Sequence, residues 1–179
     1  MAQPIIKIDN LTLEHYQTLK EAMIEAYASI GGNYWKEESI AKLINKFPQG
    51  QIVLIYDGKV VGCALSIIVD YDKLGDNHTY RDATGNFSFE THTSKGDTLY
   101  GIEVFVSPDY RGMRLARRLY DARKSLCENL NLKMIIAGGR IPKYGMYADK
   151  LNPKEYIDKV KIREIFDPTL TFQLANDFQ

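Results

Sequence analysis

The chain has 179 residues, which fits one domain able to bury roughly 70% of the surface that its unfolded state exposes. Its composition, with 45% apolar and 26% charged residues, is that of a globular protein. The formal net charge of zero argues against a dedicated nucleic-acid binder or a membrane-surface protein.

The first 50 residues predict a strand and two helices. Residues 5–8 form the strand, and Thr12 caps a helix whose apolar residues recur every three or four positions. These residues are Tyr16, Leu19, Met23, Ala26 and Tyr27. Gly31-Gly32 ends this unit, and a second helix runs from just after Trp35 to Pro48. Its inner face carries Ile40, Leu43, Ile44 and Phe47.

A hairpin and a long insertion follow. Residues 52–56 and 60–69 are β-branched runs joined by Asp57-Gly58, the dipeptide that type I′ turns require, and they predict a hairpin. Residues 71–97 are polar, contain three glycines and show little periodicity. We therefore expect residues 71–97 to be a long, partly ordered insertion between strands.

The stretch from Leu99 to Leu126 is the most informative part of the chain. An apolar run at 99–106 meets the turn signal Ser107-Pro108-Asp109, and a helical stripe begins at Leu115. A buried strand that feeds a tight turn and then a helix leaves backbone N–H groups free at the positive end of the helix dipole. Four arginines surround this turn: Arg111, Arg114, Arg117 and Arg118. The pattern predicts a pyrophosphate-binding element.

The charge distribution agrees with an anionic ligand. Residues 104–164 contain 14 Lys or Arg against 7 Asp or Glu, whereas the rest of the chain contains 9 against 16. A basic half in a neutral protein indicates either a polyanionic small ligand or merely solvated helix faces.

The last third predicts a strand, a helix and another strand. Residues 132–137 read as a short buried strand that ends at Gly138-Gly139. Asn152-Pro153 with Glu155 combines an N-cap residue, a proline at the first helical position and a capping glutamate, and it predicts a helix. Asp167-Pro168 breaks this helix, and the alternation at 170–174 predicts a last strand.

The two cysteines and the N-terminus bear on the compartment. Cys63 and Cys127 lie far apart inside apolar patterns, which indicates core residues of a reducing compartment rather than a disulfide or a metal pair. The N-terminus lacks the apolar core of a signal peptide, and no apolar run approaches about 18 residues. We therefore expect a cytoplasmic protein that does not span a membrane.

The element order and the turn after residues 99–106 resemble the GNAT superfamily of N-acetyltransferases. The family signature is Arg/Gln-x-x-Gly-x-Gly/Ala at the start of a helix, and residues 111–116 match it except that Arg114 stands at the first glycine. The resemblance implies one α/β (α+β) domain over residues 1–179, with a mixed, mostly antiparallel twisted sheet flanked by helices. Such folds close with two strands after the last helix, and the 12 residues that follow Asp167 hold only one of them.

More narrowly, the chain resembles the acetyltransferase-like domain found fused to carbon–nitrogen hydrolases. Residues 110–116, 119–124, 137–142 and 167–173 carry this resemblance. It implies either a truncated relative or a sheet that a neighbouring chain completes, as in a homodimer or with a hydrolase partner.

The superfamily resemblance also implies acetyl-CoA as co-substrate, and we expect no metal. The coenzyme A pyrophosphate would lie against Arg111, Gly112, Met113, Arg114, Leu115 and Ala116, and the pantetheine arm along residues 101–106. The Val104 N–H is the expected oxyanion donor, and the Val106 N–H an expected pantetheine contact. An arginine with ordinary helical φ/ψ angles at position 114 would still offer its N–H there, and its guanidinium would add positive charge.

Three residues are candidates for acid–base chemistry. Glu103 is the only carboxylate in its strand, and Val104 should point to the opposite face. Desolvation among apolar neighbours would suit Glu103 to act as a base through a water, unless it lies on a wet face or pairs with an arginine. GNAT enzymes often use a tyrosine as general acid about seven residues past an asparagine. Arg140 occupies that asparagine position, so the count reaches Tyr147, with Tyr144 as a close competitor.

Three functions remain open from the sequence. The first is an N-acetyltransferase acting on a small-molecule or protein amine, with residues 71–97 shaping the amine pocket or serving as a docking surface. The second is a catalytically weak acyl-CoA-binding module that acts through a partner, and the third is a binder of phosphorylated nucleotides. A metal site at His78 and His92 is disfavoured because their spacing is not that of metal ligands.

Overall fold

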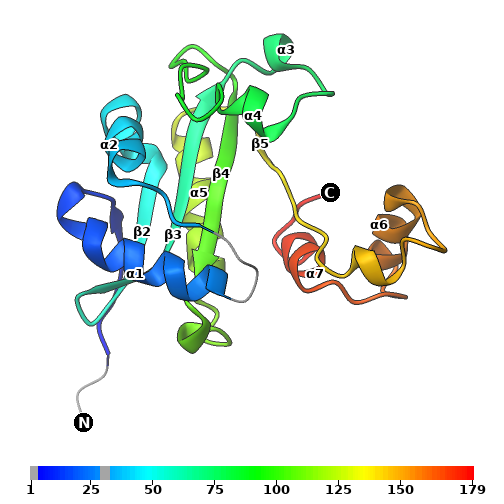
Figure 1. Ribbon diagram of the computed structural model, residues 1–179. Coiled ribbons are helices and arrows are strands. Elements are labelled where there is room, and N and C mark those ends of the chain that lie inside the picture. The colour runs from blue at the N-terminus through cyan, green and yellow to red at the C-terminus, as the bar shows by residue number, and fades with distance from the viewer. Residues whose placement is uncertain (1–3, 29–32) are drawn as a thin grey trace. The chain divides into compact units, whose positions relative to one another are not determined.

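The computed structural model describes residues 4–28 and 33–179 (Figure 1). The chain forms two compact units, residues 1–137 and residues 138–179, and each is described by itself. In the described part of the first unit, five strands form one sheet in the order β1-β2-β3-β4-β5. Their bounds are β1 Ile6–Asn10, β2 Gln51–Tyr56, β3 Lys59–Val69, β4 Thr98–Val106 and β5 Met134–Ala137. All neighbours pair antiparallel except β4 and β5, which confirms the expected mixed, mostly antiparallel sheet.

Helices cover both faces of this sheet. Helices α1 (Tyr16–Tyr27) and α2 (Glu37–Lys46) pack on one face, and α5 (Leu115–Asn129) packs on the other (Figure 1). A 3₁₀ turn at Leu13–His15, which Thr12 caps, precedes α1, so the predicted helix starts are confirmed. The predicted end of the first helical unit at Gly31-Gly32 lies outside the described residues. Each face of the sheet thus has its own apolar core, and β3 and β4 contribute to both.

The hairpin between β2 and β3 is confirmed. Asp57 and Gly58 both have positive φ angles, 46° and 82°, as a type I′ turn requires. The turn fixes the register of β2 against β3, which places Val53 opposite Cys63 in the core.

The insertion at 71–97 is more ordered than expected. It contains two short helices, α3 (Tyr71–Leu74) and α4 (Tyr80–Ala83), capped by Asp70 and Thr79. Phe89 is fully buried in the core on the α1/α2 face. The expectation of partial order missed this anchoring because a single buried aromatic ring leaves no periodic pattern.

Strand β5 is an edge strand rather than a buried one. All four of its residues are half-buried, and it pairs with β4 on one side only, within the described residues. The predicted location of the strand is confirmed, whereas the predicted burial is wrong.

The second unit is helical in its described residues. Helix α6 (Pro153–Lys161) begins with the predicted capping box of Asn152 and Glu155. The predicted last strand at 170–174 is wrong, because these residues belong to helix α7 (Pro168–Leu174). Asp167 is the N-cap of α7: its Oδ1 accepts hydrogen bonds from the N–H groups of Thr169 and Leu170, both at 3.0 Å. Asp167-Pro168 is therefore a helix start of the same kind as Asn152-Pro153.

Both cysteines are buried free thiols. Cys63 lies in the core on the α1/α2 face, and Cys127 lies in a smaller apolar cluster with Phe47, Ile68 and Leu99. Burial raises the pKa of both thiols, that of Cys63 most strongly. Among the described residues, no three His, Cys, Asp or Glu side chains are grouped as metal ligands would be, and no helix is long and apolar enough to cross a bilayer.

Candidate functional site

Among the described residues of the first unit, no strand pairs with the second half of β4 on its β5 side, which we call the open edge. Strand β5 pairs with Thr98 to Gly101 and stops there, whereas β4 continues to Val106. On the other side, β3 pairs with β4 to its end, where the Ser107 N–H donates to the Val61 carbonyl at 2.8 Å. Backbone groups alternate along a strand, so the N–H groups of Val104 and Val106 point away from β3, toward the open edge.

A β-bulge in β4 decides which face its side chains occupy. Leu65 pairs with Glu103 and Ser66 with Gly101, so Ile102 is the additional residue. Ile102 lies in the core on the α1/α2 face, and strict alternation would send Glu103 to the α5 face. The bulge instead keeps Glu103 on the α1/α2 face, while Val104 packs toward α5. Glu103 and Val104 thus occupy opposite faces, as expected.

The Glu103 carboxylate is half-buried and has two hydrogen-bond donors. Its Oε2 accepts from the indole Nε1 of Trp35 at 3.2 Å, and its Oε1 accepts from the N–H of Val104 at 3.0 Å. The carboxylate of the expected base, Glu103, therefore accepts a hydrogen bond from the expected oxyanion donor, the Val104 N–H. The alternative that the carboxylate pairs with an arginine is not found among the described ion pairs.

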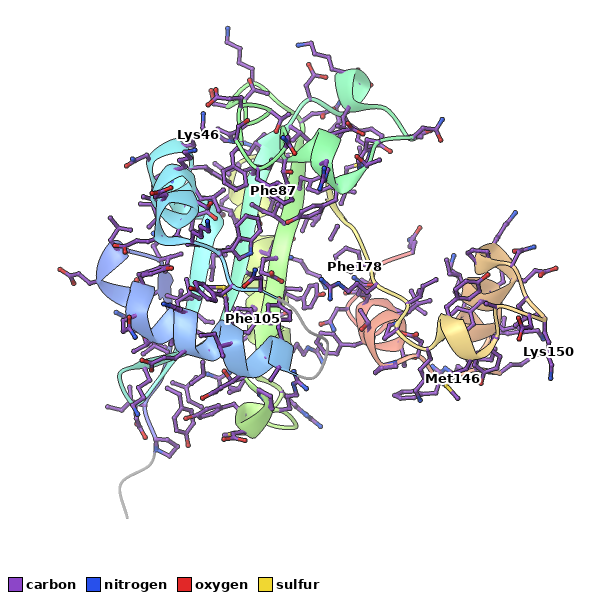
Figure 2. All side chains as sticks on the ribbon, in the orientation of Figure 1. Lys46, Phe87, Phe105, Met146, Lys150 and Phe178 are labelled. Carbon is purple, nitrogen blue, oxygen red and sulfur yellow. The ribbon has the colours of Figure 1, made fainter. Side chains whose placement is uncertain are left out.

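Aromatic side chains surround Trp35 on this face. Its ring contacts Phe87 and Phe89 of the insertion, with ring centroids 6.1 Å and 5.8 Å away. Phe87, labelled in Figure 2, is 39% exposed, whereas Phe89 is fully buried. The insertion therefore packs against the residue that binds Glu103, and the surroundings of this carboxylate are largely aromatic.

The turn after β4 is open and left-handed at two positions. A 3₁₀ turn at Pro108–Tyr110 leads to Gly112, with a φ of 80°, and then to Arg114, with φ 58° and ψ 19°, before α5 begins. Arg114 therefore does not have the ordinary helical angles that the sequence analysis considered for it. Arg114 adopts the left-handed conformation that the signature glycine would adopt without strain.

This turn has the features of an anion site. Within the described part of the chain, no hydrogen bond uses the N–H of Gly112, Met113 or Arg114, and the first N–H groups of α5 have no helical acceptor. A Cβ built on Gly112 would meet no atom within 4 Å, so the backbone faces open space. The four arginines predicted to surround the turn are all exposed: Arg111, Arg114, Arg117 and Arg118. Backbone donors, a helix N-terminus and cationic side chains thus coincide.

Replacing Arg114 by glycine should relieve this strained position. Left-handed angles cost a non-glycine residue roughly 1–2 kcal/mol, partly offset by the entropy that glycine adds to the unfolded chain. We expect the free energy of unfolding, measured by urea denaturation, to rise by about 0.5–1 kcal/mol in Arg114→Gly. In the matched control Arg117→Gly, within the first turn of α5, it should instead fall by about 1 kcal/mol. A fall in both variants would contradict the strain at Arg114.

The two candidate acids belong to the second unit. The rings of Tyr144 and Tyr147 both pack on Tyr156, with centroids 5.5 Å away in each case. The Tyr144 hydroxyl donates to the Leu151 carbonyl at 3.0 Å. Among the described residues, the Tyr147 hydroxyl has no hydrogen-bond partner. Their role as acids stays a prediction.

Sequence reasoning missed two residues near Glu103. Trp35, which donates to the carboxylate, was noted only as a helix boundary. Arg123 is buried, and its Nη2 donates to the carbonyl oxygens of Leu65 and Glu103 at 3.0 Å and 2.6 Å. A signal for Arg123 was present, because it stands four residues from both Leu119 and Cys127 on the buried face of α5.

Comparisons with solved structures identify this fold in known domains. The loading GNATL domain of CurA from Lyngbya majuscula aligns over 96% of this chain and 83% of its own, with a TM-score of 0.81 and 22% identity. The GNAT-like decarboxylase GphF, solved with isobutyryl-CoA, aligns over 94% of this chain and 84% of its own, with a TM-score of 0.75 and 16% identity. At these identities the likeness establishes the fold alone.

Sequence comparisons identify the family. The chain is 42% identical over 144 residues to the probable hydrolase YhcX of Bacillus subtilis (strain 168), and 32% identical over 140 residues to the uncharacterized N-acetyltransferase YkwB of the same strain. These matches cover 80% and 78% of this chain but only 28% and 62% of the two relatives. The sequence profile of the acetyltransferase (GNAT) family matches residues 16–148. The chain therefore belongs to the acetyltransferase (GNAT) family.

Proposed function

We propose that this chain is an N-acetyltransferase that transfers an acetyl group from acetyl-CoA directly to a primary amine. The open edge of β4 carries this proposal, because within the described ranges 4–28 and 33–179 it leaves the N–H of Val106 free beside a turn with further free donors. Pantetheine is a chain of amides and can bond to such an edge, while the pyrophosphate suits the turn at residues 111–116. Membership of the GNAT family and the isobutyryl-CoA complex of GphF support a coenzyme A thioester as co-substrate.

The contacts of Glu103 suggest how the reaction would proceed. The thioester oxygen takes the Val104 N–H from the carboxylate, which frees Oε1 beside the acceptor amine. The amine nitrogen attacks the carbonyl carbon, a C–N bond forms, and Glu103 takes a proton from the nitrogen, directly or through a water. The C–S bond then breaks, and the leaving thiolate must take up a proton. The Val104 N–H would stabilise the negative charge on the oxygen between these two steps.

Of the two candidate acids, Tyr147 is favoured. Its hydroxyl has no partner among the described residues, whereas the Tyr144 hydroxyl already donates to a backbone carbonyl. A hydroxyl without such a bond can donate its proton without losing an existing hydrogen bond. We propose Tyr147 for this role.

Calorimetry with acetyl-CoA tests the proposal. We expect heat of binding at neutral pH, a raised melting temperature, and weaker competition from ATP and ADP than from coenzyme A. A Gly112→Val variant should bind acetyl-CoA at least about tenfold more weakly, because a branched side chain blocks the open backbone and resists a positive φ. Gly58→Val, at another exposed glycine with a positive φ, is the control for strain alone. Absence of binding by the unmodified chain would refute the proposal.

A second candidate is an acyl-CoA-binding module that acts through a partner protein, such as a hydrolase or a second copy. It is favoured by the relative YhcX, which is named a probable hydrolase and of which this chain matches only 28%. An amine panel with detection of released thiol distinguishes the two candidates. Binding of acetyl-CoA without turnover on any amine would favour the module.

A further inference from the structure

The buried guanidinium of Arg123 contacts the peptide group on which the proposed oxyanion site depends. Arg123 is 1% exposed and comes from α5, the helix whose N-terminus forms the anion-binding turn. Among the described residues, it forms no ion pair with a carboxylate; its Nη2 instead donates to the carbonyls of Leu65 and Glu103. Its Nε has no partner in the described structure. A charge buried without an ion pair is costly, so its hydrogen bonds to the two carbonyls must offset part of the lost hydration.

The two carbonyls lie at the β-bulge. The additional residue Ile102 interrupts the regular β3–β4 ladder at this point, and Arg123 bridges the oxygens of Leu65 and Glu103. Gly101 makes room for this bridge, because a Cβ there would lie 2.8 Å from Nη1 of Arg123. Arg123 thus holds the two carbonyls at the bulge that keeps Glu103 on the face of Trp35.

The Glu103 carbonyl and the Val104 N–H belong to one peptide group. Because a trans peptide is planar, the carbonyl points toward β3 and Arg123, while the N–H points toward the open edge. A donated hydrogen bond from a cation at 2.6 Å draws electron density toward the oxygen and makes the N–H a stronger donor. Burial lowers the pKa of Arg123, but a guanidinium stays protonated at neutral pH.

We propose that Arg123 is a positioning residue that polarises the Glu103–Val104 peptide and thereby strengthens the Val104 N–H as the oxyanion donor. This inference rests on the proposed acetyl transfer for its effect on rate, but its effect on the peptide exists without any substrate. The positive charge acts on the thioester oxygen through one peptide group rather than by contact.

Kinetics and NMR together test this role. In Arg123→Met, which keeps most of the side-chain volume, kcat should fall about tenfold to hundredfold, somewhat less than the loss of an oxyanion donor itself. The dissociation constant for coenzyme A should stay unchanged, because the turn at 111–116 is untouched. Arg123→Lys, which keeps the charge, should recover part of kcat. Arg163→Met, which removes an exposed arginine of the second unit, is the matched control and should retain full turnover.

The amide resonance of Val104 provides a readout that needs no activity. In Arg123→Met the Val104 proton and nitrogen signals should move upfield, while those of Val106 stay in place. Gly101→Ala, which displaces the guanidinium without altering it, should shift Val104 in the same direction. An unchanged Val104 amide signal in folded Arg123→Met would overturn the inference. A fall in kcat that merely accompanies equal losses of coenzyme A affinity and of melting temperature would also overturn it. If the unmodified chain shows no turnover, the proposed function fails, and the Val104 shift still decides the role of Arg123.

Discussion

Glu103→Gln should lower kcat for acetyl transfer by about two to three orders of magnitude while leaving acetyl-CoA binding unchanged. The glutamine has the same shape, and its amide oxygen can still accept from the Trp35 indole. It cannot take a proton from the attacking amine. Steady-state release of coenzyme A across a range of amine concentrations measures kcat, and calorimetry measures binding.

The pH dependence of this variant distinguishes a lost base from a disturbed site. Without a protein base, the rate depends on the fraction of amine that is already neutral. The rate should therefore keep rising with pH until the pH reaches the pKa of the amine. Glu25→Gln is the matched control, since Glu25 lies on the exposed side of α1, away from the sheet. Unchanged kcat in Glu103→Gln would assign the base to another group.

Asp167→Ala should destabilise the second unit by about 2–3 kcal/mol, the effect expected for a buried carboxylate that holds several donors. Asp167 is fully buried; besides the two N–H groups of α7, its Oδ2 accepts from the Tyr156 hydroxyl at 2.7 Å and from the Lys143 N–H at 3.2 Å. Removing it uncaps α7 and leaves a buried hydroxyl without its acceptor. Hydrogen exchange of residues 138–179 in the full chain measures this effect locally.

Lowering the pH should also destabilise the second unit, residues 138–179. Burial alone would raise the pKa of Asp167, but the hydrogen bonds from Leu170, Tyr156, Lys143 and Thr169 outweigh it and lower that pKa. A carboxyl with a lowered folded pKa stabilises fully above its ordinary value of about 4 and loses this contribution as pH falls through the folded value. Protection of residues 138–179 should therefore decline below about pH 4 in the unmodified chain.

The matched control for Asp167→Ala is Asp149→Ala, which removes an exposed loop carboxylate of the same unit. This control should retain wild-type protection from hydrogen exchange. Equal losses of protection in Asp167→Ala and Asp149→Ala would contradict the role of Asp167.

Local signals in the sequence predicted most of the first unit correctly. The hairpin followed from Asp57-Gly58, because the φ angles of that turn depend on two adjacent residues. The amphipathic helices followed from spacing alone. The error at 170–174 arose because the alternation of Leu170, Phe172 and Leu174 was given more weight than Asp167-Pro168, whose capping bonds start a helix.

The candidate site could be predicted less well from the sequence than the fold. The bulge at Ile102 depends on the pairing of two strands and on a guanidinium from α5, which are remote from one another in the chain. Alternation predicted that Glu103 and Val104 face opposite sides, but it could not assign either residue to a face. The left-handed angles of Arg114 were also missed, since the departure from glycine suggested an ordinary helix start.

The buried thiols make the protein a convenient subject for the assays above. Thiol reagents that detect released coenzyme A react with exposed thiolates, and neither Cys63 nor Cys127 offers one in the folded state. The protein itself should contribute almost no background colour to such an assay. When the fold opens, both sulfurs become reactive, so the labelling rate of each cysteine would time the opening of its own part of the core.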